Sequence, residues 1–233
     1  MKQLDDFIEE LKQLLGKKLA CVTIFGSKAN YGLQKVTSNV DLLIILNSLT
    51  LEDLRSIAPA ISKWTKAKNR YPVIVTKEEF YASNDICALE YFDIQWNYQV
   101  VFGEDLIKNH TIGYNDLKRQ CIRELKMLIL KYRNYYAVYF KNKKAIKEAL
   151  VKLISTCLVV FRVVLRLQNI SPSVYKNDLI DQFNSIVPID RRLFKRLLAQ
   201  KEKTYDLPNY ALEDCSTLVL NELSKILKQV AAM

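Results

Sequence analysis

Strand-type apolar runs occur only in the first half of this 233-residue chain, and this asymmetry limits the folds open to it. Three short apolar runs lie at residues 18–25, 39–47 and 71–76, and an alternating apolar-polar run follows at 91–103. From about residue 114 the apolar residues recur at helical spacing. Strands followed by helices are typical of an α+β domain that precedes a helical bundle. We therefore predict an α+β domain at residues 1–110 and an all-α domain at 111–233.

Helical patterns separate the strand-type runs of the first half. Residues 3–16 place apolar side chains on one helical face. Thr50 stands three residues before an aspartate, which is a signature of a helix N-terminus. Pro59 lies inside that helix and is expected to kink or divide it. A short helix is predicted at 76–84, and the alternation at 91–103 predicts a strand with one wet face. Together these patterns predict a small mixed sheet flanked by helices.

The second half reads as a bundle of long and short helices. Predicted helices lie at 115–142, 143–169, 176–186, 189–202 and 209–230. The stretch 150–168 comes closest to a membrane span, but Lys152, Arg162 and Arg166 interrupt it. We interpret it as an amphipathic helix and expect no membrane partner.

Cysteine usage and the N-terminus bear on the compartment. The 5 cysteines are odd in number and far apart, and no C-x-x-C occurs, which argues against a zinc ribbon and a disulfide framework. Their apolar surroundings are typical of core thiols in a reducing compartment. The N-terminal residues do not have the basic-then-apolar pattern of a leader. We expect a cytoplasmic protein.

The positive charge is confined to the helical half. Residues 1–113 hold 13 Lys and Arg against 14 Asp and Glu, whereas residues 114–233 hold 22 against 11. Such asymmetry indicates an anionic partner for the basic half, with nucleic acid as one candidate, or simply a Lys-rich solvated surface. Four basic residues of the first long predicted helix form a candidate stripe for phosphate or acceptor contact: Arg119, Arg123, Lys126 and Arg133. A solvated helix face without a ligand explains the same spacing.

The stretch most suggestive of chemistry is "VTIFGSKANYGLQKVTSNVDLLIIL", residues 22–46. An apolar strand ends in Gly26-Ser27, and a turn of this kind can present backbone N–H groups and a hydroxyl to an anion. Asp41 begins the next apolar run and can hold Mg²⁺ beside a polyphosphate. The layout therefore indicates a nucleoside triphosphate with magnesium. The Gly-Lys-Ser/Thr order of a P-loop and the G-x-G-x-x-G pattern are both missing.

These residues resemble the polymerase-beta-like nucleotidyltransferase superfamily, in the group of the kanamycin-type, lincosamide-type and minimal nucleotidyltransferases. The family pattern is a strand, Gly-Ser, about ten residues, and then acidic-apolar-acidic at the start of the next strand. Here Gly26-Ser27 and "SNVDLLIIL" match it. The resemblance implies a nucleotidyltransferase fold, nucleotide binding by Gly26, Ser27 and Lys28, and transfer of a nucleotidyl group to a hydroxyl or phosphate acceptor.

The chain departs from that pattern at the metal-binding positions. The resemblance implies three carboxylates, but Asn39 stands at the first position and only Asp41 remains of the pair. A third carboxylate is expected on a later strand, and the run 71–76 carries none. Glu90 and Asp93 are the candidate substitutes, although the alternation of the run 91–103 favours a solvated strand face as their explanation. We expect weak Mg²⁺ binding.

Three hypotheses remain open from the sequence. The first is a nucleotidyltransferase-fold protein whose site is built on Asp41 and Asn39 and is impaired or inactive. In this hypothesis the protein binds nucleotide without efficient transfer. The second is an active enzyme in which Glu90 or Asp93 supplies a ligand and the acceptor is a small molecule, a protein or an RNA. The third is a non-catalytic module that binds nucleotide or nucleic acid through its basic helical half.

Overall fold

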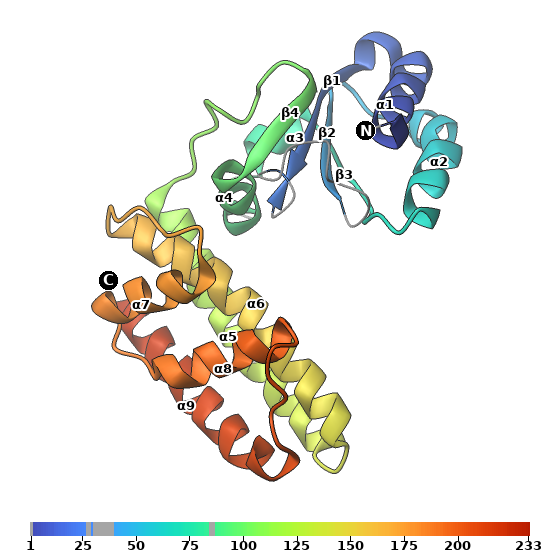
Figure 1. Cartoon of the computed structure of the whole chain (residues 1–233). Helices are drawn as coiled ribbons and strands as arrows, with labels where there is room; N and C mark the ends of the chain where they lie inside the picture. Colours follow the sequence, from blue (N-terminus) through green and yellow to red (C-terminus); the bar gives the residue numbers. More distant parts are fainter. Residues whose placement is uncertain (1, 27–28, 30–39, 84–86) are drawn as a thin grey trace. The chain divides into compact units, whose positions relative to one another are not determined.

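The structure is a computed structural model that describes residues 2–26, 29, 40–83 and 87–233. The chain divides into two compact units, residues 1–113 and residues 114–233 (Figure 1). The first unit contains strands and helices, and the second is entirely helical between its connecting loops. Whether each unit is an independently folding domain stays a prediction.

The first unit is built around a mixed sheet that has four strands in its described part. Its strands are β1 (Leu19–Phe25), β2 (Asp41–Leu46), β3 (Val73–Thr76) and β4 (Tyr98–Gly103). Its helices are α1 (Lys2–Leu15), the 3₁₀ turn η1 (Gly16–Lys18), α2 (Leu51–Lys66), α3 (Lys77–Ala82) and α4 (Ala88–Trp96). The strand order is β3-β2-β1-β4, where β1 is antiparallel to β2 and β4, and β2 is parallel to β3.

Both faces of this sheet are covered, which explains the nearly continuous apolar runs of β1 and β2. Helices α1 and α2 pack on one face, and α3 and α4 with the segment after β4 pack on the other (Figure 1). Alternate residues of β2 serve the two sides: Leu42 and Ile44 contact the first layer, and Leu43 and Ile45 contact the second. Strands buried on both faces do not show the polar alternation of a half-wet sheet.

Local signals at the helix ends agree with the observed boundaries. Thr50 and Asp53 form a reciprocal capping box at the start of α2, and Thr76 and Glu79 form another at the start of α3. Each box satisfies backbone N–H groups that the first helical turn leaves free. Gly16 follows α1 with φ +53°, a conformation that glycine adopts without the steric cost of a Cβ atom.

One expectation from the sequence is wrong, and another is narrowed. Residues 91–96 belong to helix α4 and not to a strand, so Asp93 lies on a helix that precedes β4. The apolar residues of 88–94 fit a buried helical face as well as a pleated strand, and packing against Phe80 and the sheet decides for the helix. Pro59 was expected to kink or divide its helix: it does not divide α2, which runs without interruption from Leu51 to Lys66, and a kink stays a prediction.

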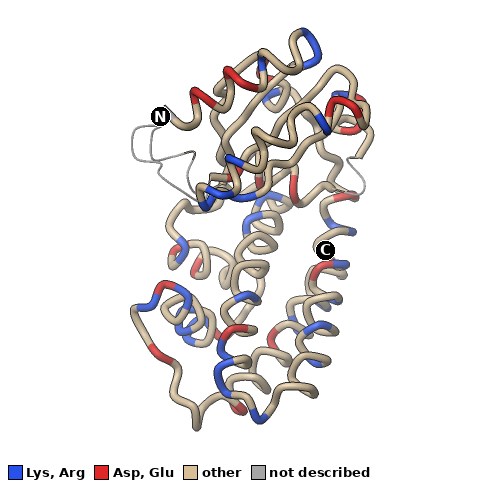
Figure 2. Tube along the Cα trace, turned by 90° about the vertical axis from the view of Figure 1, so that its right-hand side faces the viewer, with Lys and Arg blue, Asp and Glu red and all other residues tan. Residues whose placement is uncertain are grey.

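The second unit is a helical bundle. Its helices are α5 (Tyr114–Tyr139), α6 (Lys143–Leu167), α7 (Lys176–Ile186), α8 (Arg191–Lys201), the 3₁₀ turn η4 (Asn209–Ala211) and α9 (Leu212–Ala232). Helix α6 is the central element, because its side chains are buried on most of its circumference, including Phe161, which stacks on Phe183 at 3.9 Å between ring centroids. Lys and Arg residues recur along the helices of the bundle (Figure 2). None of the described helices is both long enough and apolar enough to cross a membrane.

These observations confirm the predicted fold class. The chain has a mixed sheet with flanking helices followed by an all-helical region.

Candidate functional site

One edge of the sheet gathers the end of β1 and the beginnings of the other strands. Phe25 at the end of β1 pairs with Asp41 at the start of β2 and with Tyr98 at the start of β4. Strand β3 runs parallel to β2, with Val73 beside Leu43, so its beginning reaches the same edge. The residues just outside these strand ends therefore come together although they are distant in sequence.

Gly26 lies at the centre of this edge and is fixed by Asn97. The Gly26 N–H donates to the Asn97 carbonyl at 2.9 Å, and the Asn97 side-chain amide donates to the Gly26 carbonyl at 2.6 Å. Gly26 has φ +74°, and a Cβ atom placed there would lie 3.4 Å from Asp41 Oδ2. The glycine backbone thus lies directly beside the aspartate carboxylate, in a conformation that glycine adopts without the steric cost of a Cβ atom.

Asp41 is the carboxylate of this edge and is largely enclosed. Its side chain is 17% exposed, and Oδ1 accepts a hydrogen bond from Arg70 Nη1 at 3.0 Å. Burial raises the pKa of Asp41, the Arg70 guanidinium opposes that rise, and the negative charge of Asp93 adds to it. Asp93 of α4 is therefore close enough to interact electrostatically with Asp41. A partly desolvated carboxylate beside a specific charge partner is a common property of functional sites.

Arg70 is placed at this edge by a short network in the turn before β3. Trp64 Nε1 donates to the Arg70 carbonyl at 3.1 Å, and the Trp64 ring stacks on Phe7 with centroids 4.8 Å apart. The Asn69 side chain accepts from the Val40 N–H at 3.3 Å and donates to the Trp64 carbonyl at 3.4 Å. The turn is thereby tied both to α2 and to the residue before Asp41.

The structure tests the sequence-predicted site only in part. Ser27, Lys28 and Asn39 lie outside the described residues. Gly26 and Asp41 lie side by side as the motif requires. Asp93 lies on α4, and its negative charge contributes to the raised pKa of Asp41.

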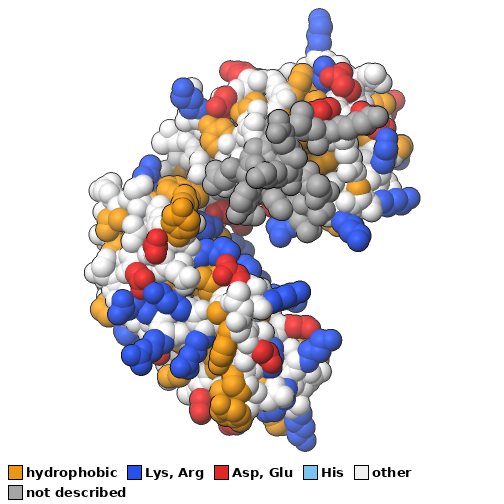
Figure 3. All heavy atoms as spheres, viewed as in Figure 1, with side chains coloured by type: hydrophobic (Ala, Val, Ile, Leu, Met, Phe, Trp, Pro, Cys, Tyr) orange, Lys and Arg blue, Asp and Glu red, His pale blue; other side chains and the backbone are white. Residues whose placement is uncertain are grey.

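The two other predicted groups lie elsewhere. Glu90 is exposed on α4, and no interaction joins it to Asp41 in the part of the chain that is described. The four basic residues of the predicted stripe are all exposed on α5: Arg119, Arg123, Lys126 and Arg133. Arg119 pairs with Asp116, and Arg123 lies 3.5 Å from Glu124, so two of the four charges have acidic neighbours. Lys and Arg side chains alternate with acidic and apolar ones on the visible surface of the helical unit (Figure 3).

The described residues offer a divalent cation only a partial set of ligands. No group of three or more His, Cys, Asp or Glu side chains suited to a metal occurs among residues 2–26, 29, 40–83 and 87–233. Mg²⁺ in nucleotide sites is held by one or two carboxylates together with substrate phosphates, and it keeps several waters. Asp41, with Asp93 nearby, fits that requirement if the nucleotide supplies the remaining oxygens.

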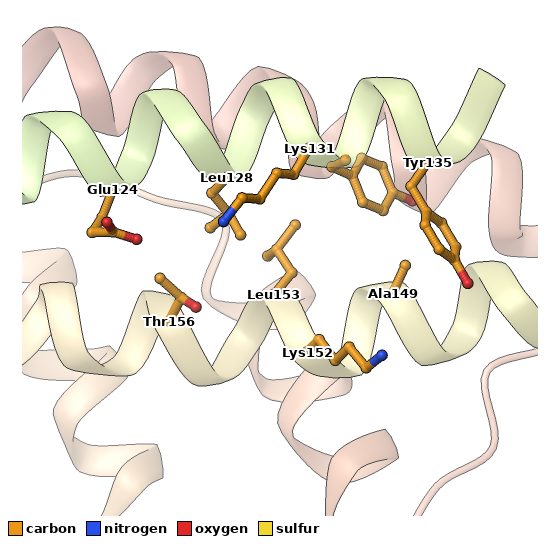
Figure 4. A pocket seen from close by; sticks show the side chains of 9 residues that line it. Glu124, Leu128, Lys131, Tyr135, Ala149, Lys152, Leu153 and Thr156 are labelled. Atoms are coloured by element: carbon orange, nitrogen blue, oxygen red, sulfur yellow. The ribbon is translucent and has the colours of Figure 1, made fainter. Parts of the chain in front are cut away.

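A pocket lies within the helical unit, between α5 and α6. It has a volume of about 290 Å³ and an apolar floor formed by Leu128, Leu153 and Ala149. Lys131 of α5 and Lys152 of α6 extend along it, and Tyr135 borders one end (Figure 4).

Two residues of the sheet edge are missing from the sequence-based prediction. Arg70 and Asn97 carry no motif of their own, and each reaches the site through a contact that spans many residues, 29 to Asp41 and 71 to Gly26. The one available signal is position, because each stands just before a strand of the sheet.

Comparison with known proteins supports the fold. No protein-family model matches the chain, and no curated protein matches it significantly. A solved structure that does match is the crystal structure of spectinomycin adenyltransferase AAD(9) from Enterococcus faecialis with ATP and spectinomycin. The match has a TM-score of 0.56 and 14% sequence identity, and it covers 96% of this chain and 98% of that chain. The chain thus shares the fold of that adenyltransferase over 96% of its length.

Proposed function

We propose that this protein is a nucleotidyltransferase that uses a magnesium-bound nucleoside triphosphate at the sheet edge around Asp41. The observation that carries the proposal is the position of Asp41 beside Gly26, at the end of β1, in a nucleotidyltransferase fold. The similar structure was solved with ATP and with spectinomycin, which supports a nucleotide and a hydroxyl-bearing small molecule as the substrate classes.

The proposed reaction joins an acceptor oxygen to the α-phosphorus of the nucleotide. The bond between that phosphorus and the bridging oxygen of pyrophosphate breaks, pyrophosphate leaves, and the acceptor proton passes to solvent. A bound magnesium ion would neutralise phosphate charge during this step. Asp41 and Asp93 would hold the ion, and the backbone at Gly26, with Ser27 and Lys28, would contact the phosphates.

Transfer is proposed to be slow, because Asn39 offers one neutral oxygen where the family pattern has a carboxylate. A neutral ligand compensates less of the dehydration cost of Mg²⁺ than a charged one does. If this account holds, Asn39→Asp raises the transfer rate at least tenfold and lowers the magnesium concentration needed for half-maximal rate. An equal or lower rate in Asn39→Asp would contradict it.

The direct test of function follows label from α-³²P-ATP and α-³²P-GTP into candidate acceptors, with Mg²⁺ or Mn²⁺ present. The acceptors are aminocyclitols such as spectinomycin, protein side chains and RNA ends. We expect transfer to one of these classes by the wild type, its loss in Asp41→Asn, and its retention in Asp6→Asn. Asp6 is an exposed aspartate on α1 and serves as the matched control. Equal transfer by Asp41→Asn and wild type would refute the assigned site.

The alternative function is nucleic-acid binding by the exposed basic residues of α5. The four residues of the predicted stripe support it by their exposure, and the acidic neighbours of Arg119 and Arg123 weaken it. Binding of this kind falls steeply as salt rises. Retention of single-stranded RNA at low salt by the wild type, and its loss in a variant with Lys126 and Arg133 both replaced by Ala, is the result that would favour it.

A further inference from the structure

The Arg70 side chain is an unusual feature of the sheet edge, because it brings a positive charge to a place where a metal carboxylate is expected. Strand β3 starts beside β2, and residues 71–76 contain no acidic side chain. Arg70 immediately precedes them, and its guanidinium lies 3.0 Å from Asp41.

The guanidinium is available to a ligand. Its side chain is 68% exposed, and Asp41 is its ion-pair partner among the described residues. Arginine presents five N–H donors in a planar fork, of which one contact to Asp41 uses a single nitrogen. The remaining N–H groups can donate to two oxygens of a phosphate in the bidentate geometry that arginine favours.

The backbone of Arg70 is held in place, so the exposed charge is not that of a free surface arginine. The Trp64 indole binds its carbonyl, and Trp64 itself is 2% exposed and stacked on Phe7. Asn69 joins the same turn to the N–H of Val40. A fixed backbone with an exposed charged tip is suited to exchanging one anionic partner for another.

The exchange has a clear electrostatic reason. Asp41 is a partly buried carboxylate that needs a cation beside it, and a single carboxylate competes poorly with a triphosphate for a guanidinium. Charge-assisted contacts to several phosphate oxygens exceed one contact to a carboxylate.

We infer that Arg70 is a phosphate-binding residue that pairs with Asp41 in the nucleotide-free protein and moves to the triphosphate when nucleotide binds. The inference rests on the proposed function for the identity of the ligand. It adds that part of the phosphate affinity comes from Arg70 and is independent of magnesium. It also adds that Asp41 opposes this part of the binding until the nucleotide-bound cation takes Arg70's place.

The test is calorimetric titration of the full chain with inorganic tripolyphosphate, and separately with ATP, each in EDTA and in magnesium. In EDTA the wild type is expected to bind tripolyphosphate, Arg70→Ala to bind it at least tenfold more weakly, and Arg70→Lys to fall between them. Asp41→Asn is expected to bind it more tightly than the wild type in EDTA, because the competing carboxylate charge is gone. Arg55→Ala, an exposed arginine change on α2, is expected to match the wild type.

Each outcome bears on one proposal or the other. Equal affinity of Arg70→Ala and wild type in EDTA overturns the role of Arg70, and so does any lack of binding by the wild type in EDTA. If the wild type then binds ATP in magnesium and Asp41→Asn does not, the proposed function stands without Arg70. If binding in EDTA depends on Arg70 and magnesium adds nothing to ATP affinity, the role of Arg70 stands and the magnesium-dependent function falls.

Discussion

Replacement of Asn97 by alanine is a sharp test of how the sheet edge is built. The side-chain amide of Asn97 donates to the Gly26 carbonyl at 2.6 Å, and this bond joins the end of β1 to the start of β4. The reverse bond, from the Gly26 N–H to the Asn97 carbonyl, uses backbone atoms and survives the substitution. Asn97→Ala therefore removes one defined contact beside Asp41 and leaves the chain path intact.

The expected loss is about 1 kcal/mol of unfolding free energy, which is typical of one part-buried hydrogen bond whose acceptor water can reach. For a cooperative unit of this size, that loss lowers the melting temperature by roughly 4 °C. The freed Gly26 carbonyl also loosens the turn that faces Asp41. We expect Asn97→Ala to bind Mg-ATP several-fold more weakly than the wild type, although both remain folded under the conditions of the titration.

Gln95→Ala is the matched control. Gln95 lies on α4, two residues before Asn97, and its amide donates to the carbonyls of Ile107 and His110, away from Gly26. Thermal unfolding and calorimetric titration of both variants separate stability from binding. Gln95→Ala should lose comparable stability and keep its nucleotide affinity. Equal nucleotide affinities of Asn97→Ala, Gln95→Ala and wild type would refute the reasoning that Asn97 orders the site.

Three further predictions concern the stability of the two units. Gly103→Ala should lower the free energy of unfolding by roughly 3 kcal/mol or more, since at φ +83° its Cβ would lie 2.0 Å from a backbone oxygen of β1. Gly16→Ala, at φ +53° with nothing within 4 Å of its Cβ, should lower it by only about 1 kcal/mol, and urea unfolding measures both. Burial lowers the pKa of His110, so as pH drops below about 6.5 the unfolded chain takes up this proton first and the free energy of unfolding should fall. In melts at several pH values, His110→Phe should abolish the part of this fall that is due to His110, and an unchanged pH dependence would contradict the reasoning. Tyr132→Phe removes a buried 2.6 Å hydrogen bond to Ser216 and should cost about 1 kcal/mol in denaturant unfolding, whereas no loss would show that the bond contributes nothing.

Local sequence signals predicted the helix starts correctly because their partners are only three residues apart. The Thr50 and Thr76 caps bind groups within their own first helical turn, so the sequence alone contains both partners. The apolar runs of β1 and β2 were equally clear, since strands buried on both faces have few polar residues.

The segment 88–96 was mispredicted because its apolar residues fit two periods. Residues 92–98 alternate as a strand would, and the buried residues of 88–94 also lie together on a helix. Contact with Phe80 of α3, which no local pattern contains, selects the helix. This error also placed Asp93 on a strand instead of on the helix from which it acts on Asp41.

The site could be predicted only where one motif contains its residues. Gly26 and Asp41 belong to a single strand-turn-strand pattern, and the structure brings them together. Arg70 and Asn97 reach them through sheet topology, since β3 and β4 lie at opposite ends of the strand order. That order depends on which strands pair, and a single sequence contains no direct record of it.

The central claim is that the sheet edge at Asp41 binds a nucleoside triphosphate with magnesium. Calorimetric titration of Mg-ATP and Mg-GTP into wild type, Asp41→Ala and Asp6→Asn tests it most directly. The account predicts saturable binding of at least one nucleotide by wild type and Asp6→Asn, and affinity at least tenfold weaker in Asp41→Ala. No binding by the wild type at millimolar nucleotide, or equal binding by Asp41→Ala, would contradict it.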